Sequence, residues 1–203
     1  MKRKYFEVAL ALGLVIALIA GARADARQVD LSQKLMRLHV IANSDTEADQ
    51  ALKLRVRDRV ISVSETLLKG VSDVDTARGI ISQNLDVIEA AANDTVKSAG
   101  FSYPVRAEVT NMYFPTRDYT SFSLPAGNYN AFRIIIGAGA GHNWWCVMFP
   151  PLCITAAEAE VEKSARDAGL SDDEINLIQS GKTVYRYKFK VIEWIEELKN
   201  MFL

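Results

Sequence analysis

The chain has 203 residues, of which 49% are hydrophobic, with 24 lysines and arginines against 25 aspartates and glutamates. This composition is typical of a folded globular protein and excludes an intrinsically disordered chain. The formal net charge of −1 gives no general field that would attract nucleic acid, so we predict no nucleic-acid partner. With only two cysteines, the chain is not a disulfide-rich miniprotein either.

The N-terminus has the pattern of an export signal. Basic residues at positions 2–4 precede residues 8–22, which contain no charged or strongly polar side chain. This apolar run is short for a helix that crosses a membrane, which favours a signal peptide. Ala22 and Ala24 supply the small residues of a cleavage site before Asp25.

An uncleaved membrane anchor at residues 5–22 is the alternative, because Glu7 and Arg23 depart from the signal-peptide pattern. Both topologies place the rest of the chain outside the cytoplasm, since the positive residues lie on the N-terminal side of the apolar run. Membrane contact is therefore expected through the N-terminal segment before cleavage. We predict a signal peptide or anchor at 1–24 and one extracytoplasmic domain at 28–203.

Residues 35–42 are predicted to form a strand with one buried face. Apolar side chains occupy every second position, and Arg37, His39 and Ile41 alternate with them on the opposite face. We expect His39 to be partly exposed on this polar face, close to the turn at residues 43–45.

Two long helices are predicted after this strand. Apolar residues recur every three or four positions over 48–67, following a capping box formed by Ser44 and Glu47. The same spacing over 74–96 predicts a second helix, and a glycine follows each of the two segments. The two segments together predict a helical hairpin.

The following sequence is rich in strand and turn signals. We predict strands at 105–110, 132–136 and 144–149, a structured loop at 113–129 and a glycine-rich hairpin turn at 137–141.

Short helices are predicted from two further capping boxes, Thr155 with Glu158 and Ser171 with Glu174. A last strand at 184–189 and an amphipathic C-terminal helix complete the chain. This order of elements favours a single α+β domain, with helices packed on a mainly antiparallel sheet.

The tryptophans at positions 144 and 145 stand beside the cysteine of a predicted strand. Alternation places Trp145 with Val147 and Phe149 on one face, and Trp144 on the other. Because we expect only one face of the strand to enter the core, Trp144 is predicted to be exposed as a recognition residue.

The two cysteines allow two interpretations. In an exported protein, Cys146 and Cys153 are expected to form a disulfide, with Pro150 and Pro151 turning the chain between them. The alternative is a secreted thiol-dependent enzyme, but no flanking pattern of a thiol hydrolase is present. Its candidate residues are Cys146 as nucleophile, His142 or His39 as base, and Asn143 or Asp45 as the group that orients the base.

Cofactor and metal sites are not expected. The spacing of Cys146 and Cys153 is too wide for a zinc knuckle, and the glycines at 137–141 do not form a dinucleotide-binding fingerprint. We therefore predict no cofactor, no metal and no small-molecule ligand.

Three segments match motifs of one known family. They are RLHVIANSD at 37–45, PAGNY at 125–129 and HNWWCVMFPPLC at 142–153. Through these motifs the chain resembles the stage II sporulation protein R family from about Leu35 to Cys153.

The resemblance implies a signalling protein of endospore-forming bacteria, secreted from the forespore into the intermembrane space of the septum. There it is expected to activate a membrane-embedded aspartic-type protease of the mother cell, which cleaves the propeptide from an inactive sigma-factor precursor. The resemblance carries no catalytic residues. We therefore predict a ligand of the protease rather than an enzyme.

A ligand of this kind needs an exposed surface with an aromatic anchor and polar groups at its rim. We expect it at the mouth of the hairpin that the glycine-rich turn closes, with the turn at 43–45 as the second candidate. The predicted partner-binding residues are His142, Asn143, Trp144, Trp145, Arg37, His39, Asn43 and Asp45.

Overall fold

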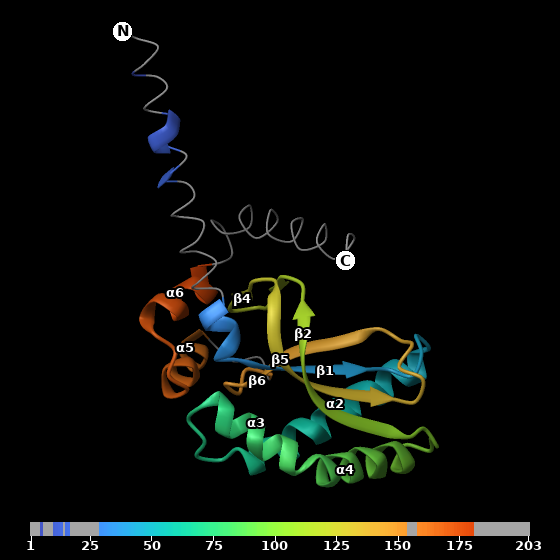
Figure 1. Cartoon of the computed structure of the whole chain (residues 1–203). Helices are drawn as coiled ribbons and strands as arrows, with labels where there is room; N and C mark the ends of the chain where they lie inside the picture. The colour runs from blue at the N-terminus through green and yellow to red at the C-terminus, as the bar shows by residue number, and fades with distance from the viewer. Residues whose placement is uncertain (1–4, 6–9, 14, 17–28, 154–157, 181–203) are drawn as a thin grey trace.

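The computed structural model of the chain describes residues 5, 10–13, 15–16, 29–153 and 158–180 (Figure 1). The predicted signal peptide or anchor is thus described only in part. The capping box of Thr155, the last strand and the C-terminal helix lie outside the described residues. Among the residues described, no helix is long and apolar enough to span a membrane.

A four-stranded sheet in the order β2-β5-β1-β6 forms the centre of the fold. Its strands are β1 (Met36–Ile41), β2 (Val105–Phe114), β5 (Gly127–Ile136) and β6 (Asn143–Phe149). β1 is parallel to β5 and antiparallel to β6, and β2 is antiparallel to β5. The predicted α+β class with a mainly antiparallel sheet is confirmed.

The glycine-rich turn at 137–141 does not close the predicted hairpin. β1 lies between β5 and β6, so the turn crosses the end of β1 instead of joining two neighbouring strands. The predicted loop at 113–129 also contains structure. It holds a separate two-stranded sheet of β3 (Arg117–Asp118) and β4 (Ser123–Leu124).

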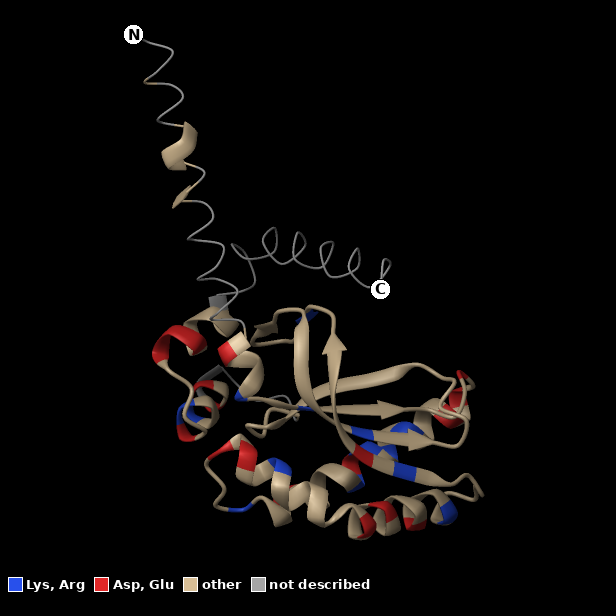
Figure 2. Ribbon diagram, in the orientation of Figure 1, with Lys and Arg blue, Asp and Glu red and all other residues tan. Residues whose placement is uncertain are grey.

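Three helices cover one face of the sheet, which we call the first face. They are α2 (Glu47–Leu67), α3 (Val74–Gln83) and α4 (Leu85–Ser98), and Figure 1 shows them below the strands. Buried aliphatic side chains from the helices and from alternate positions of β1, β5 and β6 form the core on this face. Figure 2 shows the charged residues concentrated on the helices, with most of the sheet uncharged.

Two details of the predicted helices are wrong. α2 is capped by Thr46, whose hydroxyl accepts a hydrogen bond from the Asp49 amide, and not by a box of Ser44 and Glu47. The second predicted helix is divided into α3 and α4 at Asn84, which ends one helix and begins the next. Periodicity alone missed the break because apolar residues keep a helical spacing across it.

The opposite face, the second face, is covered at one end of the sheet. The covering elements are a helical turn at 29–33, the β3–β4 pair, α5 (Glu158–Asp167) and α6 (Asp172–Ser180) (Figure 1). The predicted capping box of α6 is confirmed, since the Ser171 amide donates to Glu174 Oε2 at 2.7 Å and the Glu174 amide donates to Ser171 Oγ at 3.3 Å. Aromatic side chains are prominent in the core on this face.

Candidate functional site

The turn after β1 is bound to the turn before β6. The Ala138 amide donates to Asn43 Oδ1 at 2.9 Å, and the Gly141 amide donates to the Ala42 carbonyl at 3.0 Å. Side chains cannot replace the glycines, because a Cβ at Gly137 would overlap Asn43 and one at Gly141 would overlap the Ser44 carbonyl. Asn43, a predicted partner-binding residue, therefore holds two turns together.

His142 is fixed to the same turn by Asp45. The Asp45 carboxylate accepts a hydrogen bond from the His142 amide at 2.5 Å and is also paired with His142 Nδ1. The hydrogen bond from the His142 amide is the main cause that lowers the pKa of the Asp45 carboxyl. His142 and Asp45 are both exposed, as predicted for a contact surface, and their backbone positions are set by the turn.

A buried polar network supports this turn from α2. Asp49 accepts hydrogen bonds from Ser44 Oγ at 2.6 Å and Asn43 Nδ2 at 2.8 Å, and the Ser44 bond is the main cause that lowers the Asp49 pKa. Lys53 donates to the His142 carbonyl at 2.9 Å, and burial lowers the pKa of Lys53. The two turns are thus preorganised by α2.

Arg37 and His39 do not lie on a polar surface, contrary to the sequence prediction. β1 is an inner strand covered on both faces, and all six of its residues are buried. Arg37 is 0% exposed and His39 is 3% exposed. The structure therefore places both outside the contact surface. The prediction failed because it took a charged side chain in the strand as evidence that this face of the strand is exposed to solvent.

Aromatic rings surround both buried side chains on the second face. The Arg37 guanidinium lies 4.1 Å from the centre of the Phe114 ring, and its Nη2 donates to the Tyr119 hydroxyl at 2.8 Å. His39 is stacked on Trp145 with ring centres 3.8 Å apart. Burial, assisted by the positive charge of Arg133, lowers the pKa of His39 to about 4. The imidazole is therefore neutral at pH 7.

Both tryptophans are half-buried, and each packs against a different core. Trp144 lies on the first face, where the Arg57 guanidinium is 4.1 Å from the ring centre. Trp145 packs on the second face with Val147, as predicted, but Phe149 lies on the first face because the register shifts near Phe149. Trp144 is thus not the exposed residue that the alternation predicted, since both sheet faces are covered.

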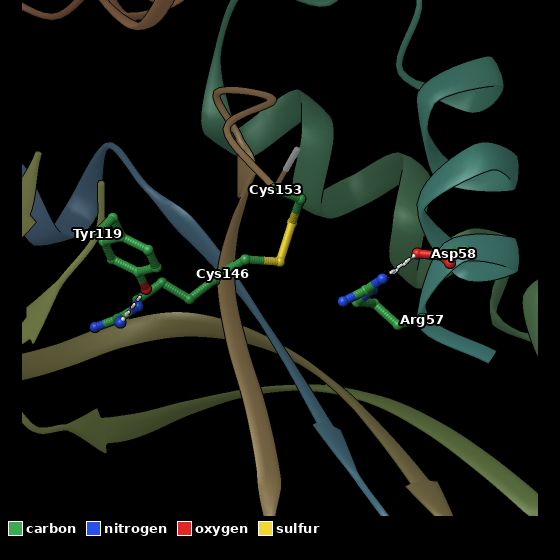
Figure 3. The surroundings of a disulfide bond; sticks show 6 residues. Arg57, Asp58, Tyr119, Cys146 and Cys153 are labelled. Carbon is green, nitrogen blue, oxygen red and sulfur yellow. Dashed lines mark hydrogen bonds and ion pairs between the residues drawn. A yellow bond between two sulfur atoms is a disulfide. The ribbon is translucent and has the colours of Figure 1, made fainter. Parts of the chain in front are cut away.

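The predicted disulfide between Cys146 and Cys153 is confirmed, with the two Cα atoms 5.0 Å apart. Figure 3 shows it beside β6, with Tyr119 on one side of the strand and Arg57 on the other. Since the chain has two cysteines, both are used by this bond. The alternative thiol-dependent enzyme, with Cys146 and His142, has no thiol nucleophile in this structure.

A pocket of about 400 Å³ lies along the outer side of β6, and we call it the β6-edge pocket. It is lined by residues 117–122, which belong to β3 and the turn after it, by residues 143–146 of β6, and by Leu152 and Cys153. Arg117 is exposed and lies 5.8 Å from the centre of the Trp145 ring.

The β6-edge pocket joins some of the predicted residues and separates others. It contains Asn143 and both tryptophans, whereas His142, Asn43 and Asp45 form the neighbouring turn. Sequence analysis missed Arg117 and Tyr119. Their segment was interpreted as a loop, and its aromatic and basic composition is the signal that could have identified them.

The structure defines the chain as an α+β protein with one disulfide, whose candidate site is a surface pocket at the edge of a mainly antiparallel sheet. Residues 32–159 match the family described as Stage II sporulation protein R (spore_II_R). The chain is also 31% identical over 193 residues to Stage II sporulation protein R of Bacillus subtilis (strain 168), covering 87% of this chain and 86% of that relative.

The chain therefore belongs to the stage II sporulation protein R family, as its motifs predicted, and has a role in sporulation. No solved structure matches it. The family match spans β1 to β6, so it includes both turns and the β6-edge pocket.

Proposed function

We propose that the chain is a signal between the two compartments of a sporulating cell. It is secreted from the forespore into the intermembrane space of the septum, after removal of residues 1–24 or while anchored by them. There it binds and activates a membrane-embedded aspartic-type protease of the mother cell. The activated protease then processes an inactive sigma-factor precursor.

Membership of the sporulation family is the observation that carries this proposal. The export signal at the N-terminus supports a location outside the cytoplasm. The disulfide between Cys146 and Cys153 is consistent with that location, because structural disulfides persist in oxidising compartments.

The geometry supports a role in binding rather than catalysis. A signal activates its receptor by binding the active state more tightly than the inactive state, which requires a surface of fixed shape. The turn of Asp45 and His142 is exposed, and it is held by a hydrogen bond from Lys53 on α2 and by backbone hydrogen bonds between the turn after β1 and the turn before β6. Asn143 continues this surface into the β6-edge pocket.

Deletion of the gene in its spore-forming host tests the proposal. Cleavage of the sigma-factor precursor in the mother cell should stop, and the full chain produced in the forespore should restore it. A version without residues 1–24 should fold in the forespore cytoplasm but should not restore cleavage. Normal precursor cleavage in the deletion strain would refute the proposed function.

A double variant separates the ligand from the thiol enzyme. Cys146→Ala with Cys153→Ala removes any thiol chemistry, and it should still restore precursor cleavage at a temperature where the exported domain is folded. Loss of cleavage by a folded, exported double variant would instead favour the enzyme.

A further inference from the structure

In the part of the chain that the structure describes, the outer edge of β6 is open along the β6-edge pocket. β6 is the last strand of the sheet, and no strand of the described residues pairs with its outer side. The Val147 carbonyl accepts a hydrogen bond at 3.1 Å from the amide of Leu152, which lies outside the sheet, so the backbone carbonyl of Val147 points away from β1. Because the direction of the backbone groups alternates along a strand, the backbone N–H and C=O groups of Trp145 and Asn143 also point outward.

The pocket has the shape that an added strand requires. It extends to both faces of β6, since Trp144 and Cys153 line it from the first face while Trp145 and Tyr119 line it from the second. Side chains of an extended peptide point alternately to the two faces of a sheet. A peptide paired with β6 would therefore place its successive side chains in the two halves of this pocket.

The charge around the pocket favours an acidic side chain in the bound segment. Arg117 lies over Trp145, and neither it nor the buried Arg37 forms an ion pair with any residue that the structure describes. The neighbouring Asp118 accepts a hydrogen bond from Ser123 Oγ at 2.7 Å, so it is directed to its own hairpin. An arginine on an aromatic ring is well placed to bind a carboxylate.

We propose that β6 binds an extended segment of the receptor as an additional strand, and that an acidic side chain of this segment pairs with Arg117. Backbone hydrogen bonds to Asn143 and Trp145 give affinity, and the two halves of the β6-edge pocket select the side chains. The identity of the receptor as the mother-cell protease rests on the proposed function. The mode of binding rests on the open edge, the pocket and the charge.

A second copy of this chain is a poorer occupant. Antiparallel pairing of two β6 edges would bring the Arg117 side chains of both copies to one interface, where like charges repel. The exported protein should therefore remain monomeric, and a dimer that Arg117→Glu dissociates would overturn the proposal.

Charge reversal at Arg117 is the first test. Arg117→Glu in the full chain should lower binding to the solubilised receptor, and precursor cleavage in sporulating cells, by about tenfold or more. The matched control is Arg106→Glu. Arg106 is an exposed arginine on β2, at the opposite edge of the sheet, so this variant should change receptor binding and precursor cleavage by less than about twofold. A folded Arg117→Glu variant with unchanged binding would overturn the proposal.

Crosslinking identifies the bound segment independently of signalling. A photoreactive residue at Asn143 should crosslink in sporulating cells to one extended, acidic segment of the receptor, whereas one at Thr110 on β2 should not. A lysine in place of the crosslinked acid should then restore binding to Arg117→Glu. If the receptor crosslinks only at Thr110, the edge is wrong although the proposed function stands. If deletion of the gene leaves precursor cleavage intact, the proposed function itself has failed.

Discussion

The two faces of the sheet bury their side chains with different chemistry. On the first face, aliphatic residues of β1 and β5 such as Leu38, Val40 and Ile134 pack against three helices. On the second face, β1 contributes Arg37 and His39, which are enclosed by aromatic rings. One strand thus supplies an ordinary apolar core on one side, and a buried arginine beside a neutral histidine on the other.

The difference shows that a polar residue in a strand can mark a second core instead of a solvent-facing surface. Aromatic faces attract a guanidinium and stack on an imidazole, so both groups can be buried without a carboxylate partner. The first face should then account for more of the stability, and the second face should be sensitive to protonation.

Truncation on the first face should have the largest effect. Phe132 on β5 is 0% exposed, and Phe132→Ala removes a large ring from the centre of the first core. We expect the free energy of unfolding to fall by about 3–5 kcal/mol, measured by chemical denaturation. Leu54→Ala on the exposed side of α2 is the control and should cost less than about 1 kcal/mol. A loss below 1 kcal/mol for Phe132→Ala would show that this face is not the main core.

Loss of the disulfide should rank second. Cys146 belongs to the first-face core, and the bond to Cys153 closes a loop over a sequence separation of 7. In the chain-entropy model, Cys153→Ser lowers the free energy of unfolding by about 2–3 kcal/mol without abolishing the fold. Thermal melting with and without reductant checks this, since reductant should affect only the wild type. Equal sensitivity of both proteins to reductant would contradict the expectation.

Acidification should act on the second face through His39. The pKa of His39 is about 4 in the folded protein and 6.5 in the unfolded chain, so the folded state favours the neutral imidazole. This preference contributes stability that is fully present above pH 6.5 and is lost as the pH falls towards 4. Relative to pH 7.5, linkage predicts a loss of about 2 kcal/mol at pH 5. Equilibrium unfolding over this range measures the loss, and His39→Leu should remove this component. A His39 resonance titrating near pH 6.5 would contradict it.

Replacement of Arg37 should have the smallest effect and the opposite sign. Arg37→Met keeps the length of the side chain and removes a buried charge that has no ion-pair partner among the described residues. We expect the free energy of unfolding to rise by about 1 kcal/mol, because burial of the charge is no longer required. The Arg37 guanidinium also lies 4.9 Å from the centre of the Tyr129 ring. A decrease of similar size would show that the contacts with the Phe114 and Tyr129 rings outweigh the cost of burial.

Local features of the fold were predictable from sequence. Helix α2 follows from its apolar spacing, the Ser171–Glu174 cap from its residue types, and the disulfide from two cysteines separated by a Pro-Pro turn. Each depends on residues close together in the chain, so the sequence contains the whole interaction.

Features that depend on distant segments were not predictable in the same way. The position of β1 between β5 and β6 is a pairing across about a hundred residues, and no local signal encodes it. The burial of His39 and the packing of Trp144 follow from this order, because only an inner strand has two covered faces. For the candidate site, His142 and Asn143 were correctly predicted to lie on a surface. The position of Arg117 beside Trp145 could be recognised only once the fold was known.

The central position of β1 also constrains the order of folding. A ribosome completes β1 long before β5 and β6, the two strands that flank it in the sheet. A nascent chain can form the helices α2 to α4 from nearby residues, but β1 has no partner strand until residue 127 and following have been synthesised. The first of the described strands must therefore remain unpaired until the strands on either side of it have been synthesised.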